Sequence, residues 1–279
     1  MKIVRAFFIV VLVFVILVPY TTAKPGDYEY KIVHYVALGD SIAGGYGLDD
    51  VQEESYVGRV AAALEDRYGA VRLENFGENG LRSDELLEIL EDEDNEQHAS
   101  YMEAIQEADL ITLSIGSNDL LQYLSRDVDL QNLKKNGDRL FTEACRKFSE
   151  NIPGILDVIS RNAPNAQLFV NNIYNPCNDI SFGISEEAAE NLEQMAEQYI
   201  QKINRGFETK RVQSVFNPKK KTGKNPQRYT LVDVKGAFED SDEKLINMMI
   251  SWRSIDPHPN REGHRVIAEL IIPQIDLNK

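Results

Sequence analysis

A serine stands where a short apolar run ends, in the stretch HYVALGDSIAGGYG at residues 34 to 47. Ser41 follows a Gly-Asp pair, and three glycines come within the next six residues. One interpretation is a strand, a turn and a capped helix, because serine and aspartate are favoured helix caps. The other is a nucleophile at a strand end, where glycines leave room for a substrate. The local sequence supports both interpretations.

Three further loops carry residues that would complete a site for acyl transfer. Gly80 lies in NFGENGLRS, and Asn118 lies in GSND. Near the C-terminus, SIDPHPNREGH supplies Asp256 and His258. Acyl transfer needs a nucleophile, a base, a group that orients the base, and donors for the developing oxyanion. Ser41, His258 and Asp256 would fill the first three roles. The backbone N–H groups of Ser41 and Gly80 and the Asn118 amide would form the oxyanion hole.

The segments between these loops alternate between two patterns. Apolar runs predict strands at 35–38, 70–77, 109–116, 166–174 and 229–234. Amphipathic patterns predict helices at 53–69, 83–94, 138–162, 186–207 and 261–272. Such alternation indicates one α/β domain with a parallel sheet covered on both faces. In these sheets ligands bind at the carboxyl ends of the strands, so the loops after the first three strands should share one edge.

In this order the four motifs resemble the sequence blocks of the SGNH hydrolases, also called GDSL esterases and lipases. The matching blocks are GDSI (39–42), NFGENGLRS (75–83), GSND (116–119) and DPHPN (256–260). The resemblance implies a three-layer α/β/α sandwich with a five-stranded, parallel, flavodoxin-like sheet. It also implies an esterase that forms an acyl-enzyme on its serine and needs neither a metal nor a cofactor.

By this resemblance Ser41 is the nucleophile, Gly80 and Asn118 are oxyanion donors, and His258 is the general base. Each of the first three also has a purely structural explanation. Ser41 would cap a helix, Gly80 would permit a turn, and Asn118 would cap the helix after the third strand. We interpret Asp40 and Asp119, which adjoin motif residues, as hydrogen-bonding loop residues. The remaining histidines are not expected to take part in the chemistry.

The acid that orients His258 is a departure from the family pattern. Many members carry it three residues before the histidine, where this chain has Ile255. Asp256 stands two residues before His258, and the prolines at 257 and 259 favour extended backbone at both positions. In an extended segment, residues i and i+2 point to the same side. We therefore expect Asp256 to orient His258. The alternative is a Ser41–His258 dyad oriented by a backbone carbonyl or a water.

The N-terminus has the pattern of a signal peptide at residues 1–23, followed by one SGNH domain at 24–279. Two basic residues precede a 13-residue apolar run, AFFIVVLVFVILV, and TTA precedes Lys24. A bilayer span needs roughly 17–25 apolar residues, so we expect a secreted protein, anchored in a membrane if the signal is not cleaved. For an exported chain, oxidation of Cys145 and Cys177 to a disulfide is a further expectation.

The chain has 279 residues, of which 43% are hydrophobic, and a formal net charge of −15. The composition allows a sizeable core, and the acidity excludes nucleic acid as a partner, because phosphate binding needs a basic surface. The basic segment at 217–228 would be a solvated loop or a weak contact with a cell surface. We expect a monomer.

The sequence indicates the substrate class less specifically than it indicates the reaction. The stretches NNIYNPC and DPHPN are similar to those of bacterial lysophospholipase-like members, which favours lipid or lysophospholipid esters. An O-acetylesterase acting on carbohydrate or cell wall is the alternative. An exported, non-catalytic binding protein is the second alternative.

Overall fold

The computed structural model describes residues 32–124, 130–177, 186–215, 229–247 and 256–277. The predicted signal peptide and the basic segment at 217–228 lie outside the described residues.

Five parallel strands form one sheet in the order β2-β1-β3-β4-β5. Their bounds are β1 Ile32–Gly39, β2 Ala70–Gly77, β3 Leu110–Ser114, β4 Gln167–Asn171 and β5 Tyr229–Val232. This order is that of flavodoxin-like folds, in which the topological switch lies between the first and third strands. The predicted fold class is therefore confirmed.

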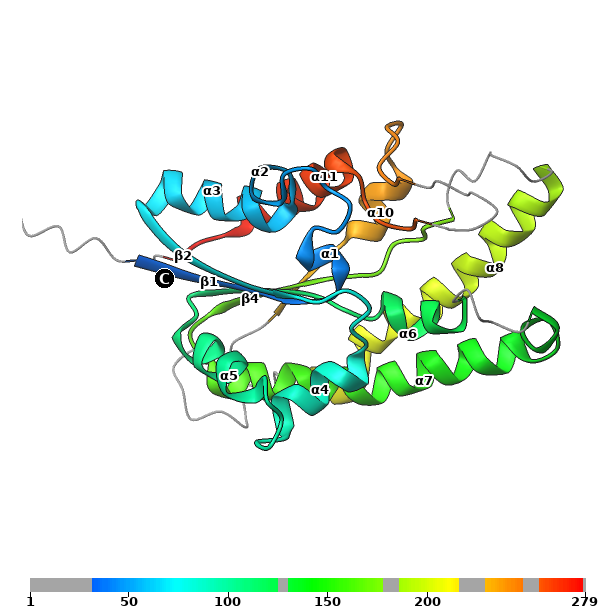
Figure 1. Ribbon diagram of the computed structural model, residues 1–279, viewed down its shortest axis with the longest axis horizontal. Helices are drawn as coiled ribbons and strands as arrows, with labels where there is room; N and C mark the ends of the chain where they lie inside the picture. Colours follow the sequence, from blue (N-terminus) through cyan, green and yellow to red (C-terminus); the bar gives the residue numbers. More distant parts are fainter. Residues whose placement is uncertain (1–31, 125–129, 178–185, 216–228, 248–255, 278–279) are drawn as a thin grey trace, which may run out of the picture. The chain divides into compact units, whose positions relative to one another are not determined.

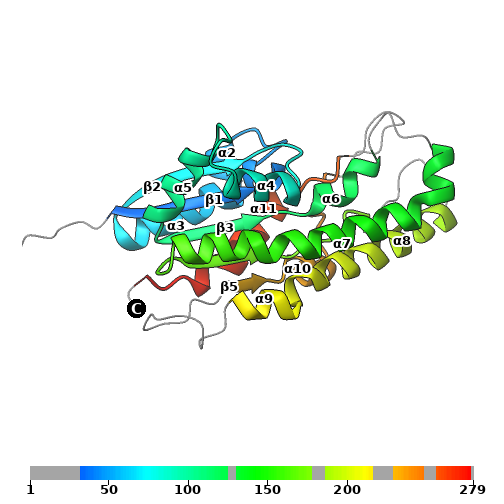
Figure 2. The same ribbon diagram turned by 90° about the horizontal axis from the view of Figure 1, so that it is seen from below.

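Helices cover both faces of the sheet, which gives three layers (Figures 1 and 2). One layer holds α2 Val51–Glu54, α3 Tyr56–Tyr68, α10 Val234–Glu239 and α11 Arg261–Ile271. The other holds α4 Ser83–Glu91, α5 His98–Glu107, α7 Leu130–Asn162, α8 Glu186–Asn204 and α9 Lys210–Val215. Two short helices, α1 Ser41–Gly44 and α6 Ser117–Leu121, follow β1 and β3 at the carboxyl edge. Three 3-10 turns complete the described structure, at Gln122–Leu124, Arg205–Glu208 and Ile272–Gln274.

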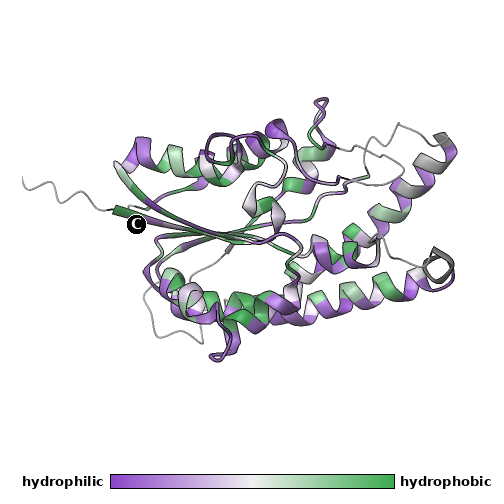
Figure 3. Cartoon of the chain, viewed as in Figure 1, coloured by the Kyte–Doolittle hydropathy of each residue, from purple (hydrophilic) through white to green (hydrophobic). Residues whose placement is uncertain are grey.

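The central strands are apolar because each faces a core on both sides. In β1, Val36 and Leu38 pack into the core beneath α4 and α7, whereas Val33, Tyr35 and Ala37 pack into the core beneath α3 and α11. In Figure 3 the hydrophobic colour gathers on the helix faces that are turned toward the sheet. Side chains alternate between the faces of a strand, so a strand buried on both sides shows a continuous apolar run.

The helices differ from the prediction most clearly in three places. The helix expected at 53–69 is two helices, because Ser55 is extended and its hydroxyl accepts a hydrogen bond from the N–H of Gly58, capping α3. Helix α5 follows the acidic run after Glu91 and is absent from the predicted elements. Its apolar residues Tyr101, Ala104 and Ile105 are buried in the core. Helix α7 begins at Leu130, before the predicted 138, and continues through Pro153.

Cys145 and Cys177 are both free thiols, so the expected disulfide is wrong. Cys145 is buried on α7, in the core between the sheet and the layer of α4 and α7. Cys177 packs against the opposite core, beneath α10 and α11. The two cysteines therefore lie in cores on different faces of the sheet.

Within the described ranges, no helix has the length and apolar character needed to cross a membrane.

Candidate active site

Ser41 is the first residue of α1 and follows β1 after a single residue. The N–H of Asp40 donates to the carbonyl of Ser114 (2.8 Å), which joins the end of β1 to the end of β3. Gly39 makes this approach possible, since it has φ +132° and a Cβ there would lie 1.9 Å from the Ser114 oxygen. The Ser41 hydroxyl is thereby held at the carboxyl edge of the sheet, where the sequence predicted it.

A line of hydrogen bonds runs from Ser41 to Asp256. The Ser41 Oγ lies 2.8 Å from Nε2 of His258. On the other side of the ring, Nδ1 of His258 lies 2.6 Å from Oδ1 of Asp256. The same carboxylate oxygen accepts the backbone N–H of His258 at 3.1 Å. The structure therefore brings together the hydroxyl, imidazole and carboxylate in the arrangement expected from the two prolines.

The segment that carries His258 is fixed by hydrogen bonds from two other parts of the chain and by the cap of the helix that follows it. The N–H of Asn247 donates to the His258 carbonyl (2.9 Å), and the Tyr174 hydroxyl donates to the Pro257 carbonyl (2.7 Å). Just beyond, Asn260 caps α11 by accepting the N–H groups of Glu262 and Gly263, each at 2.9 Å. His258 thus lies three residues before the start of α11, in a segment held by Asn247 and Tyr174.

The three predicted oxyanion donors come from the loops after β1, β2 and β3. Gly80 has φ +88°, and no atom lies within 4 Å of the place that a Cβ would take. Asn118 lies inside α6, whose cap position is Gly116, so the capping interpretation of Asn118 is wrong. Its side-chain amide donates one hydrogen bond to the Leu81 carbonyl (3.1 Å). The second amide hydrogen is left for another acceptor.

Two buried carboxyl groups adjoin these residues. Oδ1 of Asp40 accepts the N–H of Ile42 at 3.0 Å, so Asp40, and not Ser41, caps α1. Burial raises the pKa of Asp40 to about 7; the hydrogen bond from Ile42 opposes this shift, and the charge of Asp119 adds to it. Burial likewise raises the pKa of Asp119 to about 6, against the hydrogen bonds from Ser83. Both accept hydrogen bonds, as interpreted from the sequence, but only Asp40 lies in a loop, because Asp119 belongs to the first turn of α6.

The other three histidines lie outside this arrangement. His34 is on β1 with its Nδ1 3.5 Å from Glu107, and His98 begins α5 with its Nδ1 2.9 Å from the Ile89 carbonyl. His264 is fully buried in α11, where its Nδ1 accepts the Tyr56 N–H at 3.2 Å. Burial lowers the pKa of His264 to about 3, which keeps the ring neutral. Across the described part of the chain, no group of three or more His, Cys, Asp or Glu side chains could hold a metal ion.

Sequence reasoning missed two tyrosines at the site. The Tyr46 ring lies 4.6 Å from the His258 ring, centroid to centroid, at an angle of 42°. Its backbone N–H donates to the Ser41 carbonyl (3.0 Å), so the loop that follows Ser41 places a ring against His258. Tyr174, which holds Pro257, follows β4. The signal for Tyr46 was its place between Gly45 and Gly47, both with positive φ.

A small apolar cavity of about 110 Å³ opens beside Ser41 and His258. Its walls come from α1, α6, α7 and α8 and from the segment after β4. The lining includes Leu120, Phe141, Ile173, Met195, Tyr199 and Ile200. A hydrocarbon chain would fit such walls, because they offer few groups that need hydrogen bonds.

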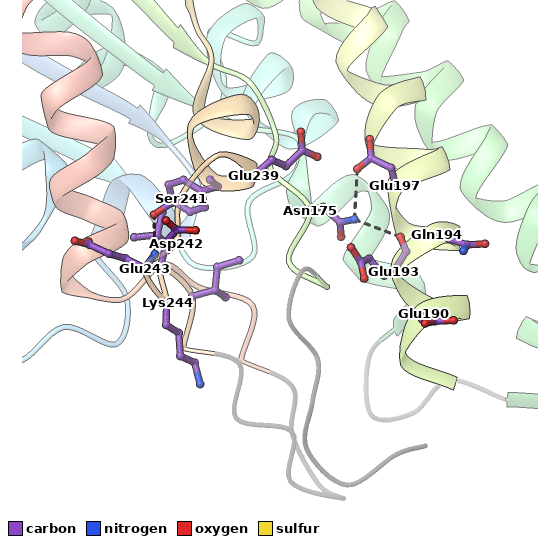
Figure 4. A pocket seen from close by; sticks show the side chains of 13 residues that line it. Asn175, Glu190, Glu193, Gln194, Glu197, Glu239, Ser241, Asp242, Glu243 and Lys244 are labelled. Carbon is purple, nitrogen blue, oxygen red and sulfur yellow. Dashed lines mark hydrogen bonds between the residues drawn. The ribbon is translucent and has the colours of Figure 1, made fainter. Parts of the chain in front are cut away.

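A second hollow, of about 990 Å³, is wide and acidic and lies between α8 and the segment after α10 (Figure 4). Neither Ser41 nor His258 is among its lining residues. Part of its charge is already neutralised, because Nζ of Lys235 lies 2.9 Å from Glu197 and also pairs with Glu239. This hollow is separate from the hydroxyl, imidazole and carboxylate described above.

Residues 37–266 match the GDSL-like Lipase/Acylhydrolase family. The chain belongs to this family and is a carboxylic ester hydrolase of the GDSL type, as the sequence resemblance predicted.

Three similar proteins extend this comparison. The uncharacterized protein YpmR of Bacillus subtilis is 30% identical over 58% of this chain, and the match spans 60% of YpmR, less than two thirds of its length. The spore germination lipase LipC of Bacillus licheniformis is 27% identical over 85% of this chain and 93% of LipC. Among solved structures, the lipase Lip_vut3 from a goat rumen metagenome has a TM-score of 0.60 and 25% identity, with 86% of this chain and 95% of that chain covered.

The hydrogen bond between Asp256 and His258 leads to the first prediction. Asp256→Asn should lower kcat for an aryl ester on the order of 10²–10⁴-fold, because the imidazole loses tautomer control and its cation loses a counter-charge. Steady-state kinetics with a thermal melt measures both activity and folding. Asp66→Asn, an exposed aspartate on α3, is the control and should retain full activity. A loss below about fivefold in folded Asp256→Asn would leave a Ser41–His258 dyad.

The second prediction concerns stability and follows from the burial of Asp40. Its pKa of about 7 in the folded protein lies above the ordinary value of 3.8. Between these values the folded state holds a proton that the unfolded state has lost, so this contribution to stability falls as pH rises toward 7. Asp40→Asn removes the titration. In urea unfolding, the variant should gain stability relative to the wild type from pH 5 to pH 8. A difference that is constant with pH would contradict the prediction, and Asp66→Asn serves as the control.

Proposed function

We propose that this protein is a serine esterase that acts through an acyl-enzyme on Ser41. The hydrogen-bonded line from Ser41 through His258 to Asp256 is the observation that carries this proposal. His258 would take the Ser41 proton as the hydroxyl attacks the ester carbonyl. Asp256 would hold the ring in the tautomer that presents a lone pair to Ser41 and would stabilise the imidazolium.

The oxyanion that forms in this step would be stabilised by the N–H groups of Ser41 and Gly80 and the side-chain amide of Asn118. His258 would then give its proton to the leaving alkoxide, which departs as an alcohol. In the second half of the reaction His258 would activate a water, which attacks the acyl-enzyme and releases the carboxylic acid and the free serine.

Lipid esters, including lysophospholipids, are the substrate class that we propose. The apolar cavity beside Ser41 supports it, because an acyl chain bound there would lie next to the hydroxyl. Two similar proteins, LipC and Lip_vut3, are lipases by name. An acetyl group would leave most of such a cavity empty, so it supports a carbohydrate O-acetylesterase less well.

The cavity generates a prediction about acyl-chain length. The wild type should hydrolyse p-nitrophenyl esters of medium and long acyl chains with higher kcat/KM than the acetate, and Ser41→Ala should be inactive on all of them. Ala196→Phe places a ring into the cavity from α8. It should lower kcat/KM for long chains by about tenfold or more, the effect of a lost apolar contact of 1–3 kcal/mol, with the acetate little changed.

Gln198→Phe is the matched control, because it adds the same ring to the exposed side of α8. It should behave as the wild type on every ester. A preference for acetate that Ala196→Phe does not change would favour the O-acetylesterase. Absence of any Ser41-dependent turnover would favour a non-catalytic binding protein. A serine-directed phosphonate, followed by peptide mass spectrometry, should label Ser41.

We also propose that residues 1–23 are a signal peptide and that the esterase is secreted. The proposal rests on the basic, apolar and small-residue pattern at the N-terminus. Protein collected from the culture medium of a host that exports it should begin at Lys24 when its N-terminus is sequenced. Cell-associated protein that retains residue 1 would instead support a membrane anchor.

A further inference from the structure

The carboxylate of Asp119 is buried between two of the loops that form the site. Its side chain belongs to α6, and the residue is 3% exposed. Oδ2 accepts the backbone N–H of Ser83 at 3.0 Å, and Oδ1 accepts the Ser83 hydroxyl at 2.5 Å. Both atoms of the carboxylate therefore bind one residue, the first residue of α4.

Burial of this charge is costly, and Arg82 offsets it only from a distance, without forming an ion pair. Among the described residues, no Lys, Arg or His lies within ion-pair distance of Asp119; the nearby Arg82 pairs with Asp84 (3.0 Å) and Glu85 (2.9 Å). A buried carboxylate without a cation lowers stability unless its hydrogen bonds compensate. A helix start can be capped by a neutral side chain at lower cost. The position of Asp119 therefore calls for an explanation other than capping.

The residues that adjoin Asp119 and Ser83 along the chain offer an explanation. Asn118 directly precedes Asp119, and its amide donates to the Leu81 carbonyl (3.1 Å). Leu81 directly follows Gly80. Two neighbouring residues of α6 thus bind the segment 81–83 at two points. That segment connects Gly80 to α4, and Asn151 of α7 supports it through a hydrogen bond to the Ser83 hydroxyl (3.0 Å).

We propose that Asp119 is the positioning residue of the oxyanion hole. By clamping α6 to the start of α4, it fixes the separation between the Asn118 amide and the Gly80 N–H, two donors that come from different loops. The inference rests on the proposed function, because it takes Asn118 and Gly80 to be the donors. Donors held in place before the reaction stabilise an oxyanion more than donors that must reorganise.

Asp119→Asn tests the clamp with little change of volume. The amide can accept one Ser83 hydrogen bond but not both, so kcat for an aryl ester should fall by about tenfold, less than the 10²-fold expected for loss of a donor. KM should change less than about twofold, since the clamp acts on the transition state. The inhibition constant of phenylboronic acid, whose adduct with a serine hydroxyl mimics the tetrahedral intermediate, should rise in proportion to the loss of kcat.

A double-mutant cycle with Asn118→Ala separates positioning from general stability. If Asp119 acts through the hole, adding Asp119→Asn to Asn118→Ala should cost less than about threefold in kcat, because that hole is already disrupted. Additive losses would overturn the proposal. Asp84→Asn is the control, since it removes an exposed charge from the same first turn of α4 and should leave kcat unchanged. An equal loss in this control would assign the effect to charge at the helix start.

Further results distinguish a failure of this proposal from a failure of the proposed function. If Asp119→Asn does not fold, Ser83→Ala removes the hydroxyl bond but keeps the backbone bond, and it should show the same pattern with a smaller loss. If Asn118→Ala lowers kcat and the phosphonate labels Ser41, but Asp119→Asn and Ser83→Ala match the wild type, the clamp alone is wrong. If the phosphonate labels another residue and Ser41→Ala is active, the proposed function itself is wrong.

Discussion

The hydrogen bond between Ser41 and His258 joins two residues that are 217 positions apart in the sequence, and the rest of the site depends on that contact. The two partners are held in different ways. Ser41 follows β1, which lies between β2 and β3 and is buried on both faces, so its place is set by the sheet. No strand carries His258. Its segment is located by hydrogen bonds to Asn247 and Tyr174 and by the Asn260 cap of α11, and a loop fixed in this way can hold a base as firmly as a strand would.

Features of the fold and the site could be predicted from the sequence when they depend on residues that are close together in the chain. The strands were predicted because burial on both faces leaves an apolar run, and the parallel arrangement then placed the loops with Ser41, Gly80 and Asn118 at one edge. The contact of Asp256 with His258 could also be predicted, because two prolines restrict the backbone conformation of these residues. Helix α5 was missed because its three buried residues follow an acidic run that resembles a solvated loop.

Contacts between loops could not be predicted in the same way. Tyr46 lies near His258, and Ser83 near Asp119, only after the strands have been placed side by side, and no sequence period connects them. The expected disulfide shows the same limit. Distance along an element indicates which end of the sheet a residue occupies, but not which face its neighbours cover. Cys145 and Cys177 lie in cores on opposite faces of the sheet, a fact that neither spacing nor export could reveal.

Two buried carboxylates adjoin the proposed oxyanion hole and present an electrostatic problem, because a negative charge there would oppose the charge that develops in the transition state. Their hydrogen bonds suggest how the problem is reduced. Asp40 accepts the N–H of Ile42, one residue after Ser41, and Asp119 accepts that of Ser83, three residues after Gly80. Each carboxylate therefore binds an N–H further along the chain, and within the described structure the N–H groups of Ser41 and Gly80 have no acceptor. Burial also raises the pKa of Asp40 to about 7 and that of Asp119 to about 6, so part of their charge is removed near neutral pH. The carboxylates can thus hold the loops in place while, in the part of the chain that the structure describes, the backbone N–H groups of the proposed oxyanion donors stay free of acceptors.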